Sequence, residues 1–424
     1  PKSLIVDFFV DKKDGFMPIN LAYLGAVLEN ADIETSIIDI NIMAISLDEF
    51  ESRYLHSLDA DVIGLTCTTV SYIECKKLAH LIKRRYPEVK IIVGGCHVTF
   101  MAEQALKECD SFDIVVRGEG ESTIVSIVNC LHDNKPLDKV PGISYRLGKD
   151  IMHNRDAEVI KDLDQIPFPA RHLLRIGEYA SHGIVTSRGC PRQCIFCSAG
   201  ALGGGIYRIR SAKNIIDELK QINDGRSIFF YDNTFSTHIK KSKEICQAII
   251  DEELDIQWEV ELRADTVTED FIKILKMAGC DGIQFGVESG SGEILKEIKK
   301  HITKTQVKKA CQIALNYNIE VACSFTLGHP SDTKETIQET LDFMQELKNM
   351  GCDIYFGVIV PYPGTEIFNR SDHFGITIEH YNWSKYTPLN VCMSTKNLTR
   401  EQLGKELLKL YFSMNPEALV ESEL

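Results

Sequence analysis

The sequence predicts an α/β protein in two main parts. The first is an N-terminal doubly wound, Rossmann-like parallel sheet, and the second is a partial barrel of six β/α units followed by a short C-terminal helical region. Three observations predict this class. Apolar runs alternate with stretches of helical periodicity, and turn residues follow the apolar runs. The chain of 424 residues is also too long to fold around a single hydrophobic core of ordinary size.

The first domain is predicted over residues 1–140. Apolar, β-rich runs occur at 3–10, 34–40, 61–67, 90–95 and 113–117. Helix-period stretches such as 18–30 and 73–86 lie between them. Near-continuous apolar strands in this β-α order are typical of a parallel sheet covered by helices on both faces.

Small, hydroxylic and acidic residues follow three of these predicted strands. They are Thr66, Thr68 and Thr69, then Gly94, Gly95 and Thr99, and then Gly118, Glu119, Gly120 and Glu121. Ligands of doubly wound folds bind at the carboxyl ends of the strands, where such residues permit close backbone approach. We therefore expect a cofactor-binding rim here, although ordinary turn chemistry explains the same residues.

Residues 141–175 are predicted to form a hairpin around Gly148 and a proline-punctuated linker. The second domain follows at 176–366. Its strand candidates are 184–187, 227–231, 256–262, 282–287, 320–326 and 353–359. Helical segments separate them at 211–222, 239–251, 268–278, 304–316 and 332–348. Six such units in series predict a partial barrel with its active site at the carboxyl ends of the strands.

The remaining residues, 367–424, are predicted to form a helical extension. Its last helix should begin near Thr399, which forms a capping box with Gln402. No motif in this region identifies a substrate, and packing is the simpler role for the aromatic residues there.

Composition narrows the class of partner. Lysine and arginine number 47 against 61 acidic residues, a net charge of −14, which disfavours nucleic acid as the main substrate. No stretch approaches the roughly 20 apolar residues of a membrane span, so we expect no membrane partner. The N-terminal residues run straight into a strand-like segment without a secretory signal, and we therefore expect a cytoplasmic location.

The sharpest feature is the spacing Cys190-x3-Cys194-x2-Cys197 in a loop after a predicted strand. Thiolates are the ligands of iron–sulfur clusters, and the next cysteine is distant, at Cys246. Three ligands would leave one iron of a 4Fe–4S cluster open to a small molecule. A structural zinc site is the alternative, but it normally requires four protein ligands.

The other 11 of the 14 cysteines are scattered singly, and each is expected to be a small buried apolar residue. They are Cys67, Cys75, Cys96, Cys109, Cys130, Cys246, Cys280, Cys311, Cys323, Cys352 and Cys392.

The cysteine loop resembles the radical S-adenosylmethionine (SAM) superfamily, whose signature CxxxCxxC has an aromatic residue before the last cysteine, here Phe196. The resemblance covers roughly 183–365. It implies that the open iron binds the amino and carboxylate groups of SAM. One-electron reduction, by a donor such as flavodoxin or ferredoxin, then cleaves SAM to methionine and a 5′-deoxyadenosyl radical.

Further segments are similar to the later strand ends of the same family. The resemblance places Asp232 and Asn233 near the SAM amino group, Arg263 near its carboxylate, and Glu288 at its ribose or amino group. It places the SFTLGHP segment, with Gly328 and Pro330, near the adenine and ribose. Taken singly, a buried Arg or Glu is as often part of a structural ion pair.

The whole chain looks like the cobalamin-binding radical SAM class, because segments such as VIGLTCTTVSY and DIVVRGEGEST precede the barrel. This resemblance implies a corrin lying across the strand ends of the first domain. The sequence lacks the DxHxxG motif that supplies a cobalt-ligating histidine, and this class generally lacks it too. His97 is therefore expected to form hydrogen bonds within its loop.

The resemblance implies a cobalamin-dependent methyltransferase that acts on an unactivated carbon, or phosphorus, of a small molecule. Cob(I)alamin takes a methyl group from one SAM, and a substrate radical generated with a second SAM then captures it. The alternative is cyclisation, ring contraction, dehydration or epimerisation in the same architecture, with or without cobalamin. An RNA methylthiotransferase would need further cluster cysteines near the first strand and a basic C-terminal module, and a pure cofactor carrier would need no SAM contacts.

Overall fold

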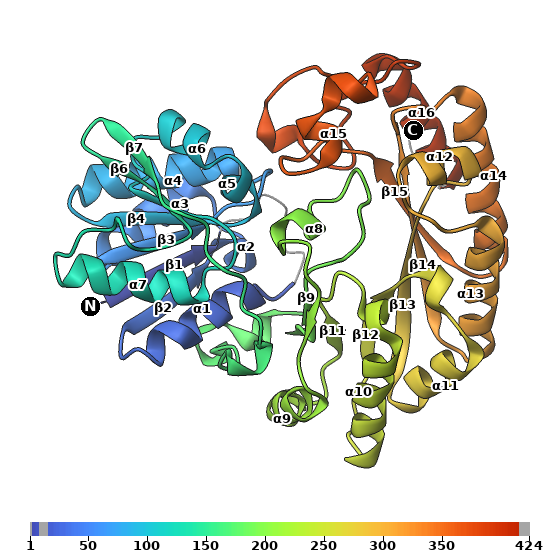
Figure 1. Cartoon of the computed structure of the whole chain (residues 1–424), viewed down its shortest axis with the longest axis horizontal. Coiled ribbons are helices and arrows are strands. Elements are labelled where there is room, and N and C mark those ends of the chain that lie inside the picture. The colour runs from blue at the N-terminus through green and yellow to red at the C-terminus, as the bar shows by residue number, and fades with distance from the viewer. Residues whose placement is uncertain (1, 8–15, 415–424) are drawn as a thin grey trace. The chain divides into compact units, whose positions relative to one another are not determined.

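The computed structural model describes residues 2–7 and 16–414. The chain forms two compact units (Figure 1). The first comprises residues 1–183 together with 202–204 and 208–210. The second comprises residues 184–201, 205–207 and 211–424. The predicted α/β fold class, a Rossmann-like parallel-sheet unit followed by a partial barrel of six β/α units, is confirmed.

The first unit contains a seven-stranded sheet of order β2-β1-β3-β4-β5-β6-β7. Its strands are β1 (Lys2–Asp7), β2 (Glu34–Asp39), β3 (Val62–Thr66), β4 (Lys90–Gly94), β5 (Ile114–Val116), β6 (Ile143–Leu147) and β7 (Asp150–His153). Strands β1 to β5 pair in parallel, whereas β6 and β7 are antiparallel. The order 2-1-3-4-5 is that of flavodoxin-like folds, which bind ligands where the order reverses, next to β1 and β3.

Helices pack on this sheet through residues at helical spacing. They are α1 (Ile19–Glu29), α2 (Ile40–Met43), α3 (Leu47–Arg53), α4 (Tyr72–Arg85), α5 (Cys96–Phe100), α6 (Ala102–Glu108) and α7 (Glu121–His132). Leu21 and Leu28 of α1 and Ile127 of α7 are fully or almost fully buried in one core with strand residues such as Ile92. The predicted hairpin around Gly148 is confirmed as β6 and β7, and it extends the sheet by two strands. Residues 8–10 of the first predicted strand lie outside the described residues.

The second unit contains a six-stranded sheet of order β15-β14-β13-β12-β11-β8. Its strands are β8 (His182–Ile184), β11 (Ile228–Phe230), β12 (Trp258–Leu262), β13 (Cys280–Glu288), β14 (Glu320–Leu327) and β15 (Asp353–Val358). The pairs from β11 to β15 are parallel. Neighbours in sequence are therefore neighbours in the sheet, as a partial barrel requires.

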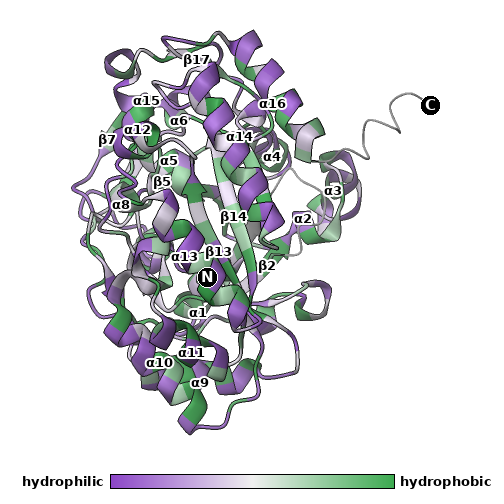
Figure 2. Ribbon diagram, turned by 90° about the vertical axis from the view of Figure 1, so that its right-hand side faces the viewer, coloured by the Kyte–Doolittle hydropathy of each residue, from purple (hydrophilic) through white to green (hydrophobic). Residues whose placement is uncertain are grey.

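The helices of the second unit alternate with these strands. They are α8 (Ala199–Leu202), α9 (Ala212–Ile222), α10 (Ile239–Asp251), α11 (Glu269–Met277), α12 (Gly292–Glu297), α13 (Lys304–Asn316) and α14 (Lys334–Asn349). In Figure 2, helices such as α10 and α14 carry both hydrophilic and hydrophobic bands, whereas β14 carries little of the hydrophilic colour. Such banding is expected of helices that bury one face against a sheet.

The strand predicted at 184–187 is wrong in detail. It is broken into β8, which ends at Ile184, and a two-residue strand β9 (Ser187–Arg188). The break occurs because the backbone N–H groups of Thr186 and Ser187 donate to the Asp232 carboxylate, at 2.9 and 2.7 Å, and so are not available to a neighbouring strand.

After the barrel the chain forms α15 (Glu366–Asn369), the antiparallel pair β16 (Thr377–Ile378) and β17 (Met393–Ser394), and α16 (Arg400–Met414). The predicted capping box is confirmed, since the Thr399 N–H donates to Gln402 Oε1 at 2.8 Å and the Gln402 N–H donates to Thr399 Oγ1 at 3.3 Å. Within the described ranges, no helix is long and apolar enough to span a bilayer.

Candidate functional site

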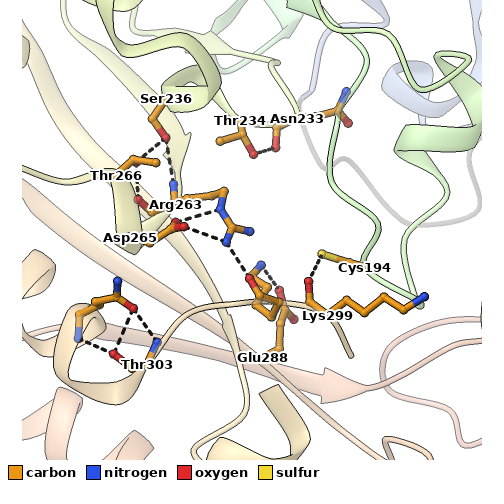
Figure 3. A network of polar contacts seen from close by, with 12 residues as sticks. Cys194, Asn233, Thr234, Ser236, Arg263, Asp265, Thr266, Glu288, Lys299 and Thr303 are labelled. Atoms are coloured by element: carbon orange, nitrogen blue, oxygen red, sulfur yellow. Dashed lines mark hydrogen bonds and ion pairs between the residues drawn. The ribbon is translucent and has the colours of Figure 1, made fainter. Parts of the chain in front are cut away.

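The loop with the three clustered cysteines lies between β9 and α8 and is held by backbone hydrogen bonds. The Ile195 N–H donates to the Ile298 carbonyl at 3.3 Å, and the Ile367 N–H donates to the Ile195 carbonyl at 3.1 Å. The Cys194 thiol contacts the Lys299 carbonyl at 3.7 Å (Figure 3). These contacts place the loop against the segment that follows α12.

The sulfur atoms of Cys190, Cys194 and Cys197 do not all lie within 4.8 Å of one another. In the described part of the chain, one group of three or more potential ligands has all its ligand atoms within 4.8 Å of one another, and it does not include Cys190, Cys194 or Cys197. In a 4Fe–4S cluster each thiolate binds a different iron, so the sulfur atoms must be spread apart. The Ala199 N–H donates to Cys197 Sγ at 3.5 Å, a contact that would stabilise a thiolate ligand. These residues fit the cluster.

Burial and nearby positive charges act on the thiol pKa values of the cysteine loop in opposite directions. Burial raises the pKa of Cys194, while the positive charges of Lys300 and Arg263 act to lower that pKa. Burial likewise raises the pKa of Cys197. A cationic cluster would replace the thiol protons, and the two basic side chains compensate part of the remaining negative charge.

Arg263 follows β12 and is fixed in position by two partners. Its Nε and Nη2 donate to Asp265 at 2.9 and 3.2 Å, and its Nη2 also donates to the Lys300 carbonyl at 2.6 Å (Figure 3). Its side chain is only 6% exposed. A buried, pre-oriented guanidinium is suited to recognising a carboxylate. Asp265 was not predicted, although an acidic residue two positions from a buried arginine is a usable signal.

Glu288 ends β13 in a strained conformation. Its φ is +70°, and the register of β13 against β14 shifts between Gly286 and Glu288. A bulge of this kind re-aims a side chain at a strand end. The carboxylate accepts from Lys300 Nζ at 2.8 Å and from Thr326 Oγ1 at 3.4 Å. Positive φ in a non-glycine residue costs about 1–3 kcal/mol and is concentrated at functional sites.

Asp232 lies two residues after the end of β11 and is buried, 3% exposed. Besides the two backbone N–H groups, the Thr186 hydroxyl donates to it. Burial raises its pKa to about 6, although the hydrogen bonds from Thr186 and Ser187 act in the opposite direction. Asp232 thus holds the segment that leads into the cysteine loop, and its predicted contact with SAM stays a prediction. The neighbouring Asn233 is exposed.

The SFTLGHP segment turns sharply at Gly328, whose φ is +86°. The backbone N–H groups of Gly328 and His329 both donate to the buried Asp332 carboxylate at 2.9 Å. The His329 ring packs edge-on against Phe196 of the cysteine loop, with ring centroids 6.2 Å apart, and His329 Nε2 contacts Thr326 Oγ1 at 3.1 Å. Thr326 in turn bonds Glu288, so the loop, the turn and Glu288 form one continuous network.

Residues of the predicted cofactor-binding rim in the first unit also form hydrogen bonds with one another. The Thr99 hydroxyl accepts from the Gly118 N–H at 3.1 Å, and His97 Nδ1 lies 3.2 Å from Thr69 Oγ1. His97 is thus a hydrogen-bonding residue, as expected, but its partner Thr69 lies in the loop after β3 and not in the loop of His97 itself. Its ring is buried, 2% exposed, and burial lowers its pKa to about 4.

Glu119 has a different environment from the one predicted. Its carboxylate forms an ion pair with Arg208 Nη1 at 2.8 Å and accepts from the Ile160 N–H at 2.8 Å. Both side chains are largely buried, with 14% and 5% exposed. These contacts satisfy the carboxylate within the unit, so a direct cofactor contact by Glu119 stays a prediction. Neither Arg208 nor Lys300 was predicted, because nothing in the local sequence marks them.

Family profiles and sequence relatives place this chain among known proteins. The profile of the Radical SAM superfamily matches residues 184–344, and the profile of the B12 binding domain matches residues 13–128. An uncharacterized methyltransferase of Pyrococcus horikoshii is 32% identical over 416 residues, which cover 95% of this chain and 89% of the relative. The anaerobic magnesium-protoporphyrin IX monomethyl ester cyclase of Rubrivivax gelatinosus is 26% identical over 427 residues, covering 94% and 74%.

Among solved structures, the radical SAM methyltransferase TsrM from Kitasatospora setae, with cobalamin and a [4Fe-4S] cluster bound, superimposes with a TM-score of 0.75. It is 16% identical and covers 96% of this chain and 81% of its own. At that identity the likeness shows a shared fold. Together with the close relative and the two profiles, it defines the class: the chain belongs to the cobalamin-binding radical SAM superfamily. As a member it is an enzyme that uses a 4Fe–4S cluster, SAM and cobalamin.

Proposed function

We propose that this enzyme is a cobalamin-dependent methyltransferase that transfers a methyl group from SAM to an unactivated carbon, or phosphorus, of a small molecule. The observation that carries the proposal is that one chain matches both the B12 binding domain and the Radical SAM superfamily and is 32% identical to an uncharacterized methyltransferase over nearly its whole length. When bound, the cofactors supply reductive SAM cleavage and a transferable methyl group.

The chain's own residues would hold SAM in a fixed orientation. Arg263, oriented by Asp265, faces the SAM carboxylate in this proposal, and Glu288, oriented by Lys300, accepts hydrogen bonds from the ribose or amino group. The turn at Gly328 and Pro330 bounds the adenine. Since these groups are buried and already paired, little reorganisation is needed on binding.

The partners in this proposal are a small-molecule substrate and a one-electron donor such as flavodoxin or ferredoxin. The net charge of −14 and the absence of a basic run in the sequence support a substrate other than nucleic acid. We propose no membrane partner for the enzyme.

Product analysis tests methyl transfer. The anaerobically prepared enzyme, loaded with cluster and cobalamin, is incubated with reductant, methyl-labelled SAM and fractions of a small-molecule extract. We expect S-adenosylhomocysteine and 5′-deoxyadenosine to form together, in amounts well above one per chain, and the label to appear in a product. S-adenosylhomocysteine limited to about one per chain would report methylation of the corrin alone and would contradict the proposal.

The second candidate is cyclisation, which the similarity to the cyclase favours. This chemistry consumes SAM only for hydrogen abstraction. The same experiment distinguishes the two, because a cyclase would yield 5′-deoxyadenosine in multiple turnovers without matching S-adenosylhomocysteine or label transfer.

A further inference from the structure

Three cysteines that are isolated in the sequence converge in the second unit. Cys311 lies on α13, Cys323 on β14, and Cys352 directly before β15. Their sulfur atoms all lie within 4.8 Å of one another, and those of Cys311 and Cys323 are 3.7 Å apart. All three are buried, as expected for each singly, but the topology of neighbouring βα units also brings them together.

This thiol trio lies on the opposite face of β14 from the SAM site. Successive side chains of a strand point to opposite faces. Thr326, which bonds Glu288, is half-buried on one face of β14. Cys323 lies on the other face, together with the buried Val321, Phe325 and Leu327. The trio is thus separate from the cysteine loop and from the groups proposed to hold SAM.

The three thiols are also inaccessible and free of disulfide bonds. Cys311 and Cys323 are 0% exposed, and Cys352 is 4% exposed. Ordinary packing of two buried thiols would explain the contact between Cys311 and Cys323. It does not explain why the sulfur of Cys352, from a third part of the fold, lies at the same point.

The spacing suits one soft metal ion. An ion at the centre of a triangle with sides of 3.7 to 4.8 Å lies about 2.1 to 2.8 Å from each sulfur, a range that includes the Zn–S bond of about 2.3 Å. Thiolates select Cu⁺ and Zn²⁺ over harder cations. Within residues 2–7 and 16–414, no histidine or carboxylate joins the group, so the protein offers three sulfur ligands.

We infer that Cys311, Cys323 and Cys352 form a second metal site that joins α13 to the start of β15 across β14. It would hold a single Cu⁺ ion, because Cu⁺ accepts three thiolate ligands, whereas structural Zn²⁺ normally takes four protein ligands. On binding, the thiols release their protons to solvent and the sulfurs become thiolate ligands, with no change of oxidation state. The site is independent of the proposed methyl transfer. Its role would be to stabilise the β14–β15 edge of the barrel.

The test uses the anaerobic enzyme with its 4Fe–4S cluster in place, so that Cys190, Cys194 and Cys197 are already occupied. Cu⁺, supplied as its glutathione complex, is added, weakly bound metal is removed, and the copper is quantified. We expect about one Cu⁺ per chain, with X-ray absorption at the copper edge showing three sulfur neighbours. The ion should also raise the thermal midpoint of unfolding.

The Cys352→Ser variant should lose the bound ion and the thermal shift while it keeps the cluster and SAM cleavage. Cys352→Ala serves as a second variant in case serine is poorly tolerated at this site. Cys392→Ser is the matched control, because Cys392 is also fully buried in this unit but lies outside the trio. Failure of the wild type to retain Cu⁺, or equal retention by wild type and Cys352 variants, would overturn the inference.

Discussion

Glu288 is the most tightly constrained residue of the proposed SAM site. Its strained backbone, its ion pair with Lys300 and its link through Thr326 to the turn at His329 all fix one carboxylate at the end of β13. Removal of its charge should therefore affect ligand binding more than folding.

We predict that Glu288→Gln weakens SAM binding about tenfold, about 1.4 kcal/mol, because the carboxylate loses its negative charge and its pairing with Lys300. The cluster absorbance should be unchanged. The measurement is equilibrium binding of SAM to the cluster-loaded enzyme. Glu259→Gln is the matched control, since Glu259 lies on the neighbouring strand β12 with an exposed side chain. Equal SAM affinities in all three proteins would make Glu288 a purely structural residue.

Asp232 gives a prediction about pH. Its pKa of about 6 in the folded state lies above the ordinary value of 3.8, so the folded state binds the proton more tightly. Stability from this group is therefore present at low pH and is lost as the pH rises towards 6 and beyond. We predict that wild type loses about 2 kcal/mol relative to Asp232→Asn between pH 4.5 and 7.

Urea unfolding of the two proteins at both pH values measures this difference. Asparagine is a suitable replacement, because its Oδ1 still accepts from Thr186 and Ser187 while the charge is removed. The same stability difference at both pH values would show that Asp232 is not a buried carboxyl of raised pKa.

The residues of the site differ in how far the sequence could predict them. Cys190, Cys194 and Cys197 could be identified because all three ligands lie within one short loop. Lys300 could not, because it meets Glu288 only through the turn after α12, where Lys299 and His301 have positive φ. Likewise, the bonds of Asp232 to Thr186 and Ser187 join segments about 46 residues apart.

At the scale of elements, the rim of the first unit contains two glycines in demanding conformations for different reasons. Gly95 has φ of +109°, and a Cβ there would lie 2.4 Å from the Cys67 carbonyl oxygen. Gly118 has φ of +76°, but a Cβ there would meet nothing within 4 Å. Glycine at position 95 thus permits the close approach of the loops after β3 and β4. Gly118, in contrast, borders open space at the strand ends.

We predict that Gly95→Ala destabilises the first unit by at least about 2 kcal/mol, because strain and a backbone clash add. Gly118→Ala should cost about 1 kcal/mol and should instead weaken cobalamin binding, since its new methyl group would enter the ligand's space. Chemical unfolding and corrin retention after gel filtration measure the two effects. The reverse pattern, with Gly95→Ala stable and Gly118→Ala binding normally, would contradict this assignment of roles.

The elements themselves were largely predictable. Helices α10 and α13 have the predicted bounds, because their apolar residues recur at helical spacing over more than three turns. The break between β8 and β9 was not predictable, because it depends on the side chain of Asp232, which no local pattern places there. The convergence of Cys311, Cys323 and Cys352 was hidden for the same reason, since it depends on the packing of three elements.

At the scale of the whole molecule, the chain has two units, and each matches a family that binds a different cofactor. The alternation of strand and helix predicted both units, and the cysteine spacing together with family resemblance predicted the cofactors. The substrate was not predictable, because the region after residue 366 combines short elements such as α15, β16 and β17 without a recognisable motif.

The most direct test is to produce the enzyme anaerobically with cobalamin supplied and to quantify iron, sulfide and corrin. We predict about four iron, four sulfide and one corrin per chain. In the Cys190→Ala, Cys194→Ala, Cys197→Ala triple variant, the corrin should be retained and the cluster lost. A wild-type protein that acquires a cluster but no corrin would contradict the claim that this chain is a cobalamin-dependent radical SAM enzyme.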